Sequence, residues 1–372
     1  MRHLETLLVH RPTIPGEPAA ASSTPIYQSA TFCVDRQGRW DYSRSGNPTR
    51  DVLERQLAEL DGARRSFAFA SGMAAVSAAL RMAPAGSRVL AGIDLYGGTL
   101  RLLDDLAIDR GLDLVFVDPN DLDALSRALE TTTALLWIET PSNPRLEVVD
   151  LSAIAALTRR AGTLLAVDNS ILSPYRQRPL ELGADLAVQS ATKVLGGHSD
   201  LTAGVVSVAD AELAERLAFR QNAEGTALAP FDSWLLLRGL ETLGVRNHQQ
   251  VENAAEIARR LRSSGVVEQL FSAPESYVIS FDTGSLERSR RLLIELELFR
   301  ATVSFGGVTS SINLPCEMSH ASIPERWRSL GDLSPSLVRL SIGIENVADL
   351  WADLDRALRR VSSAPRLLEV AR

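Results

Sequence analysis

Short apolar runs alternate with amphipathic stretches through most of the first two-thirds of the chain. The apolar runs predict strands at residues 88–91, 112–118, 134–139, 164–168, 186–189 and 204–208. Apolar residues at helical spacing between them predict helices at residues 51–60, 100–109, 121–129 and 151–160. Because strands alternate with helices, we expect βαβ units and a mostly parallel sheet with helices on both faces. Ligands of such sheets bind beyond the carboxyl ends of the strands.

The pattern differs on either side of this region. Residues 1–45 are expected to be irregular because prolines are scattered through them, at Pro12, Pro15, Pro18 and Pro25. Tyr27 and Phe32 favour an arm that wraps a partner over a disordered tail. Later residues predict helices at 233–243, 249–262 and 347–361, with antiparallel strands at 277–282, 301–305, 311–314 and 338–342. We therefore divide the chain into an arm (1–45), an α/β domain (46–235) and a smaller α+β domain (236–372).

The composition narrows the classes of function. Hydrophobic residues make up 45% and charged residues 23% of the 372 residues, as in an ordinary globular protein. A net charge of −7 argues against a nucleic-acid or anionic-membrane partner. Cys33 and Cys316 form neither a metal-ligand cluster nor a disulfide framework, which fits a reducing cytosol. With no signal-peptide core and no apolar run near the ~20 residues that span a bilayer, we expect a cytoplasmic enzyme or binding protein.

The segment after the strand predicted at residues 186–189 carries the strongest chemical signal. Ser190 and Thr192 alternate with Ala191, so both hydroxyls point the same way from an extended segment. Lys193 follows them, where the ligand of a parallel sheet binds. This group suits a phosphate-bearing aldehyde cofactor, because the amine forms a Schiff base with the aldehyde and the hydroxyls bind the phosphate. Taken alone, Lys193 also fits a solvated lysine after a strand.

Asp168 ends the apolar strand that precedes this segment. A carboxylate there hydrogen-bonds the pyridine nitrogen of such a cofactor and keeps it protonated, which makes the ring an electron sink. Alone, Asp168 equally fits an acid that caps a turn. Its place on the strand preceding that of Lys193 favours the catalytic interpretation.

Two strand-to-helix turns supply further candidates. Ser71, Gly72 and Met73 open a helix whose first amides form a seat for phosphate, although Ser71 also suits a plain N-cap. Tyr96 stands at the second turn, where its ring either lies flat against a cofactor ring or packs in the core.

These segments occur with others in an order that is specific to one family. In chain order they are Tyr42-Ser-Arg44, Ser71-Gly-Met73, Tyr96-Gly-Gly, Glu139-Thr-Pro-Ser-Asn143, Asp168-Asn, Ser190-Ala-Thr-Lys193 and Val338-Arg339-Leu-Ser341. Over essentially its whole length the chain resembles the cystathionine synthase/lyase (Cys/Met metabolism) family of pyridoxal-phosphate enzymes. Residues 167–185, 221–232 and 303–324 are similar to the plant-type cystathionine β-lyases. The resemblance implies the fold-type-I pyridoxal-phosphate transferase-like fold, with a mostly parallel seven-stranded sheet flanked by helices and a smaller C-terminal α+β domain.

The resemblance also implies how the cofactor, pyridoxal 5'-phosphate, is held. Lys193 binds it covalently and shuttles protons, and Tyr96 stacks on the ring and is the second catalytic residue. Asp168 pairs with the pyridine nitrogen. The phosphate is bound by a set of residues from two segments, namely Gly72, Met73, Ser190 and Thr192.

Substrate binding and assembly follow from the same resemblance. Arg339, with Asn143 and Ser304, binds the α-carboxylate of a sulfur amino acid, a planar anion that suits a guanidinium fork. Taken alone, Arg339 also fits a surface arginine beside a strand. Tyr42 and Arg44 reach the phosphate of a neighbouring subunit, so the chain is expected to form a homo-oligomer, commonly a dimer of dimers.

Departures from the family pattern bear on the reaction. Gln189 and Val194 stand where many relatives have a histidine and an aromatic residue, and we interpret both as tuning. Val303 stands where relatives that act at the γ-carbon of cystathionine often have an acid. Methionine γ-lyases also tend to have an apolar residue there, but usually carry a cysteine in place of Gly98.

We therefore expect β-elimination of L-cystathionine to homocysteine, pyruvate and ammonia. Cystathionine γ-lyase or a cysteine- or methionine-desulfurising lyase is the alternative on the same scaffold. A non-catalytic binder of an amino acid or cofactor is disfavoured because Lys193 and Tyr96 are both present.

Overall fold

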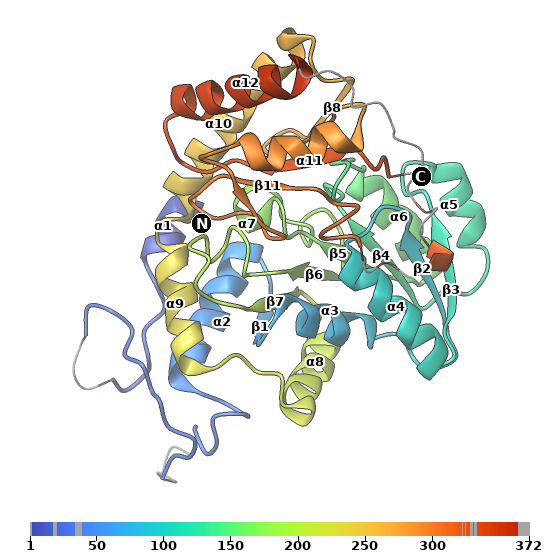
Figure 1. The fold of residues 1–372 in the computed structure, drawn as a ribbon. Helices are drawn as coiled ribbons and strands as arrows, with labels where there is room; N and C mark the ends of the chain where they lie inside the picture. Colours follow the sequence, from blue (N-terminus) through green and yellow to red (C-terminus); the bar gives the residue numbers. More distant parts are fainter. Residues whose placement is uncertain are drawn as a thin grey trace.

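The computed structural model describes residues 2–17, 21–33, 39–321, 323, 325–327, 330 and 333–363. Pro18 of the arm and Pro324 of the third plant-like segment lie outside the described residues. The chain forms two layered regions, each built around one sheet (Figure 1). Among the described helices, none combines an apolar stretch with the length that a bilayer crossing needs.

A seven-stranded sheet forms the larger region. Its strands are β1 (Arg65–Phe69), β2 (Arg88–Gly92), β3 (Asp113–Val117), β4 (Leu135–Glu139), β5 (Leu164–Asp168), β6 (Leu186–Gln189) and β7 (Gly204–Val208). They lie in the order β1-β7-β6-β5-β4-β2-β3, and β7 alone runs against its neighbours. The predicted, mostly parallel sheet is confirmed. The carboxyl ends of β4, β5 and β6 meet at the same end of the sheet.

Helices cover both faces of this sheet, which explains why its strands are continuous apolar runs. On one face pack α3 (Gly72–Leu80), α4 (Gly97–Asp109) and α8 (Ala211–Glu224). On the other face pack α2 (Pro48–Asp61), α5 (Leu122–Ala128), α6 (Leu151–Ala161) and α9 (Pro230–Leu240). A short helix, α7 (Ser173–Arg176), follows β5.

Helix α2 shows how local sequence sets the ends of an element. The side chain of Asn47 accepts from the amide of Thr49 at 3.0 Å, and Pro48 occupies the first turn, where its missing N–H is not needed. The helix ends at Gly62, whose φ of 64° is the left-handed conformation that glycine adopts without strain. This ending buries the last residue, Asp61, against the sheet.

A five-stranded sheet forms the smaller region. It contains β8 (Gln269–Ser272), β9 (Val278–Asp282), β10 (Arg300–Ala301), β11 (Ser311–Asn313) and β12 (Leu337–Ser341), in the order β10-β11-β12-β9-β8. One face packs on α10 (Leu243–Ser264), α11 (Leu286–Glu295) and α12 (Val347–Ser363). Residues Glu325–Trp327 form a 3-10 turn. Because side chains alternate along a strand, Ser280 and Arg339 face the opposite side. There Ser280 Oγ donates to the carbonyl of Pro144 at 2.7 Å, so this face meets the larger region.

Several expectations about these elements are wrong. The arm is not irregular throughout, because α1 (Leu4–Val9) buries Leu7 and Leu8, whose carbonyls accept from Gln56. The strand expected at residues 301–305 is confined to β10, which pairs parallel, not antiparallel, with β11. The apolar pattern also misses α8, β8 and α11, which bury few apolar side chains. Residues 21–33 and 39–45 extend away from both sheets (Figure 1).

Candidate active site

Lys193 lies in a turn just beyond β6. The backbone of this turn is held by an arginine of the smaller region. The guanidinium of Arg246, on α10, donates to the carbonyls of Val194 at 3.0 Å and Leu195 at 3.4 Å. Gly197 has a φ of 72°, and a Cβ added there would lie 1.9 Å from Arg246. A side chain at this glycine would therefore displace Arg246 and loosen the turn that carries Lys193.

The amine of Lys193 is held by polar and aromatic groups of the smaller region. Its Nζ donates to Ser304 Oγ at 2.8 Å and lies 4.5 Å from the centroid of the Phe305 ring. Burial lowers the pKa of Lys193 to about 8, the positive charge of Arg339 adds to the shift, and Asp168 opposes it. The amine therefore carries a larger uncharged, nucleophilic fraction near neutral pH than an exposed lysine does.

Asp168 is buried at the end of β5, one strand away from the segment that carries Lys193. Its Oδ1 accepts from the amide of Ser170 at 3.0 Å and from Ser170 Oγ at 2.6 Å. Burial raises the pKa of Asp168, whereas these hydrogen bonds and then the charge of Lys193 lower it. A buried carboxylate of this kind is suited to a cationic partner.

Ser170 is a further residue of the site, which the sequence analysis did not single out. Besides donating to Asp168, its Oγ accepts from the amide of Ser190 at 2.7 Å. One hydroxyl therefore ties the end of β5 to the end of β6. The available signal was a serine two residues after an aspartate, a spacing at which the aspartate oxygen commonly bonds the backbone.

The predicted phosphate seat lies where α3 meets the end of β6. Ser71 caps α3 by accepting from the amide of Ala74 at 3.1 Å, and the first-turn amides of Gly72 and Met73 have no acceptor within the helix. A Cβ added at Gly72 would lie 2.7 Å from Ser190 Oγ, so only glycine lets this hydroxyl sit beside the helix N-terminus. These groups form an anion-binding cradle.

Thr192 is engaged differently from Ser190. Its hydroxyl donates to the carbonyl of Ala203 at 3.2 Å and accepts from the amide of the same residue at 3.0 Å. A cavity of about 720 Å³ is lined by Thr192, Ser304 and Phe305, among other residues. The lining thus includes Thr192, which precedes Lys193 in the chain, and Ser304, which accepts from the Lys193 amine.

Tyr96 forms the turn before α4, and its ring lies over the first glycines of that helix. A Cβ added at Gly98 would lie 2.4 Å from the Tyr96 ring and 3.1 Å from Met73 Sδ. The absence of a side chain at Gly98 therefore lets the ring approach the N-terminus of α3. The side chain is 37% exposed, which leaves the ring open to a ligand.

Arg339, Asn143 and Ser304 are brought together as the resemblance implied. Arg339 is 1% exposed, and its Nη1 donates to Asn143 Oδ1 at 2.9 Å. Its Nη2 donates to the carbonyls of Val303 at 3.3 Å and Ser304 at 3.4 Å. The guanidinium thus bonds the backbone of two residues that lie beyond the end of β10. Burial lowers the pKa of Arg339 to about 10, which leaves it charged near neutral pH.

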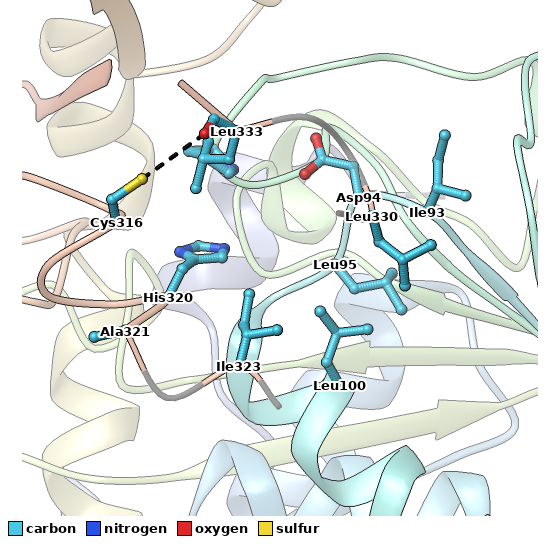
Figure 2. Close-up of a pocket in the computed structure, with 11 residues that line it drawn as sticks. Ile93, Asp94, Leu95, Leu100, Cys316, His320, Ala321, Ile323, Leu330 and Leu333 are labelled. Atoms are coloured by element: carbon cyan, nitrogen blue, oxygen red, sulfur yellow. Dashed lines mark hydrogen bonds between the residues drawn. The ribbon is translucent and has the colours of Figure 1, made fainter. Parts of the chain in front are cut away.

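Asn143 is held in turn by His320, which the sequence reasoning did not single out. The Nε2 of His320 donates to the Asn143 carbonyl at 3.1 Å. Burial lowers the pKa of His320 to about 4, so the ring is neutral. Figure 2 shows His320 and Cys316 on one wall of a hollow of about 360 Å³, with Asp94 and Leu95 on the opposite side. This hollow lies behind the Tyr96 turn.

Tyr42 and Arg44 are not brought to Lys193 within one chain. The guanidinium of Arg44 lies 5.6 Å from the Tyr42 ring and donates to the carbonyl of Asn222 on α8 at 3.0 Å. Tyr42 is 44% exposed. The predicted contact of these two residues with a phosphate therefore depends on a second subunit.

The remaining residues of the site fit a phosphate-bearing pyridine aldehyde. Lys193 supplies a buried amine, Asp168 a buried carboxylate, and Gly72 with Ser190 a cradle that a Cβ would fill. The amine, carboxylate and anion-binding groups are those that the aldehyde, the protonated ring nitrogen and the phosphate require.

Comparisons with known proteins point to one family of enzymes. The family model for the Cys/Met metabolism PLP-dependent enzymes matches residues 5–359. The chloroplastic cystathionine beta-lyase of Mimosa pudica is 46% identical over 368 residues, which cover 94% of this chain and 80% of that protein. The cystathionine beta-lyase of Schizosaccharomyces pombe is 43% identical over 92% of this chain and 93% of its own length. The crystal structure of cystathionine gamma-lyase from Lactobacillus plantarum complexed with L-serine matches with a TM-score of 0.93 and 36% identity, covering 97% of this chain and 100% of that one.

Proposed function

This chain belongs to the Cys/Met metabolism PLP-dependent enzyme family, and on that premise we propose that it splits L-cystathionine at its cysteine half. The products are homocysteine, pyruvate and ammonia. The enzyme is a carbon–sulfur lyase whose cofactor is pyridoxal 5'-phosphate. The observation that carries the choice of bond is Val303, which offers no anion beside Ser304 to hold a distal ammonium group.

Residues of the site have distinct tasks toward the cofactor. When bound, pyridoxal phosphate supplies an electron sink that makes the Cα proton of an amino acid acidic. Lys193 would attach it through Nζ, and Asp168 would hold the protonated pyridine nitrogen. Its phosphate would lie against the first amides of α3, at Gly72 and Met73, and the hydroxyl of Ser190, and the Tyr96 ring would cover the pyridine ring. The Thr192 hydroxyl is assigned to the same phosphate, reached by turning away from Ala203.

Arg339 orients the substrate. Its guanidinium is fixed by Asn143 and by the carbonyls of Val303 and Ser304, so little side-chain freedom is lost when a carboxylate binds. The planar α-carboxylate accepts from the guanidinium, which places the Cα–H bond toward Lys193. Ser304 contacts both cations of the site. Its hydroxyl accepts from the Lys193 amine at 2.8 Å, and its carbonyl accepts from Arg339.

Two groups move protons during the reaction. Lys193 Nζ removes the proton from Cα, and its lowered pKa of about 8 keeps enough of the amine uncharged for this step. As the bond between Cβ and sulfur breaks, the electron pair leaves with sulfur, which is protonated by Lys193 Nζ or by the Tyr96 hydroxyl. The three-carbon fragment then hydrolyses to pyruvate and ammonia.

The same proposal extends to assembly and metabolic role. Tyr42 and Arg44 lie apart from Lys193 within the chain, which supports an active unit of at least two subunits. The proposed assembly joins two such pairs as a dimer of dimers. Homocysteine as product places the enzyme in methionine biosynthesis, in the transsulfuration part of sulfur amino-acid metabolism.

Identification of the 2-oxo acid tests the proposal directly. The purified holoenzyme is incubated with L-cystathionine, and the products are separated by liquid chromatography and mass spectrometry. Pyruvate with homocysteine is expected. The similarity to a cystathionine gamma-lyase structure favours γ-cleavage as the second candidate, and a predominance of 2-oxobutyrate with cysteine would establish that reaction instead.

A further inference from the structure

Glu139 is a buried acid beside the site that the mechanism above does not use. It ends β4 and pairs in register with Asp168, the last residue of β5. Its residue exposure is 8%, and the next residues of the chain lead to Asn143. A carboxyl group in such a place is costly to bury unless its oxygens are bonded.

The bond that Glu139 makes is to the backbone of Tyr96. Glu139 Oε2 accepts from the Tyr96 amide at 2.8 Å. Tyr96 is the N-cap residue of α4, and its own side chain caps no amide of that helix. The orientation of the turn therefore depends on a carboxyl group from β4, 43 residues away in the chain.

The surroundings of the turn explain why one hydrogen bond matters here. On one side, Asp94 and Leu95, which directly precede Tyr96, border the hollow of about 360 Å³ (Figure 2). On the other side, the Tyr96 ring rests over Gly98, which has no side chain to hold it in place. The Glu139 bond is thus the polar contact that holds the backbone amide of Tyr96 at the start of α4.

The surroundings of Glu139 favour the uncharged form of its carboxyl group. Burial raises its pKa well above the usual range, and the negative charges of Asp168 and Asp94 add to this, whereas the Tyr96 amide and Arg339 oppose it. A neutral acid still accepts from an amide through its carbonyl oxygen. Glutamine has the same shape and keeps this acceptor, so it is a close mimic of the native group.

We propose that Glu139 is a positioning residue, which holds the Tyr96 ring against the cofactor by accepting from the Tyr96 backbone amide. The role rests on the proposed use of Tyr96 in the carbon–sulfur lyase reaction. Glu139 itself touches neither substrate nor cofactor in this role. Its removal leaves the part-buried Tyr96 amide without this acceptor, and the turn then relaxes toward the hollow.

Two substitutions at Glu139 and a matched control test this proposal. Glu139→Met removes the acceptor at nearly constant size, and Glu139→Gln keeps it. Glu147→Met is the control, because Glu147 pairs with Arg145 at 2.7 Å and is not bonded to the Tyr96 turn. Each holoenzyme is assayed for kcat and KM, and the visible circular dichroism of the bound cofactor is recorded as a readout independent of turnover.

We expect Glu139→Met to lower kcat by about 10- to 100-fold and to weaken the visible dichroism, because the Tyr96 amide loses its partner and the ring its position. Glu139→Gln and Glu147→Met should stay within about twofold of the wild type, since both leave that hydrogen bond in place. In a Tyr96→Ala background, where the ring is already absent, adding Glu139→Met should change kcat by no more than about twofold.

Three outcomes would overturn the proposal. Equal losses in the wild-type and Tyr96→Ala backgrounds would mean that Glu139 acts on overall structure, and a Glu139→Gln loss as large as that of Glu139→Met would mean that its charge matters. An unchanged dichroism in Glu139→Met would mean that the ring does not move. If Glu139→Met fails to fold, Glu139→Ala in both backgrounds gives the same comparison. The test uses rate ratios and the cofactor spectrum, which do not depend on which 2-oxo acid is formed. Formation of 2-oxobutyrate would therefore refute β-cleavage but leave the proposed role of Glu139 standing.

Discussion

Replacing Val303 by glutamate is the sharpest test of which bond the enzyme breaks. Val303 precedes Ser304, whose hydroxyl lies 2.8 Å from the Lys193 amine, and its side chain is 57% exposed. The backbone there is fixed because the Val303 carbonyl accepts from Arg339 and the neighbouring Thr302 carbonyl accepts from Asn313. The substitution therefore adds a carboxylate at the mouth of the site without moving the chain.

The size of the effect of Val303→Glu follows from the exposure of position 303. Two unit charges 4 Å apart attract by about 4 kcal/mol at the effective dielectric of a protein surface, before the cost of removing water. Exposed ion pairs retain only about 0.2–1 kcal/mol. Since position 303 is more than half exposed, we expect about 1 kcal/mol between the introduced carboxylate and the distal ammonium of cystathionine, or about a fivefold change in relative rate.

The assay measures 2-oxobutyrate and pyruvate from cystathionine in the same reaction. The ratio of 2-oxobutyrate to pyruvate should rise about fivefold in Val303→Glu and fall back toward the wild type in high salt, which screens exposed charges. Val303→Gln matches the size without the charge and should leave the ratio nearly unchanged. An equal shift in both variants, or none in Val303→Glu, would refute the electrostatic explanation.

Two further predictions concern assembly and stability. Mixing inactive Arg44→Ala with inactive Lys193→Ala subunits should restore activity, because a hybrid dimer contains one site with both residues; no recovery after verified subunit exchange would contradict a shared site. Burial raises the pKa of Asp61 to about 7 although Ser207 and Gln189 donate to it, so its contribution to stability is complete below its unfolded pKa near 4 and is lost as the pH rises through 7. The melting temperature of Asp61→Asn, minus that of the wild type, should therefore increase between pH 5 and pH 8. A difference that stays constant over this range would show that Asp61 does not titrate there.

The parts of the site that the sequence predicts are those that depend on local pattern. An apolar run that ends in a polar residue marks the carboxyl end of a buried strand, and this placed Asp168 and Lys193 correctly relative to the sheet. Arg339 was predicted from a family motif, and the structure bonds it to Asn143. In each case a short segment gives the position of the residue, whereas its interpretation as a site residue needs the other segments as well.

Contacts between distant segments account for what the sequence did not predict. Gln189 stands next to the phosphate segment, yet its amide donates to both oxygens of Asp61, 128 residues away. Its side chain therefore bonds the end of α2 and does not face the cofactor segment. Glu139 likewise bonds Tyr96 across 43 residues. Neither partnership has a periodicity that a single sequence reveals, because side-chain direction is set only once the strands have paired.

The two buried cations of the site depend on each other in a way that links substrate binding to proton transfer. Lys193 and Arg339 lie 4.5 Å and 5.0 Å from the centroid of the Phe305 ring, and the charge of Arg339 lowers the pKa of Lys193. While the carboxylate site is empty, this repulsion favours the uncharged amine that attaches an aldehyde. A substrate carboxylate on Arg339 offsets the repulsion, so the amine becomes a stronger base at the moment when a Cα proton has to be removed. In the proposed reaction, the arginine that orients the substrate would thus also adjust the base that acts on it.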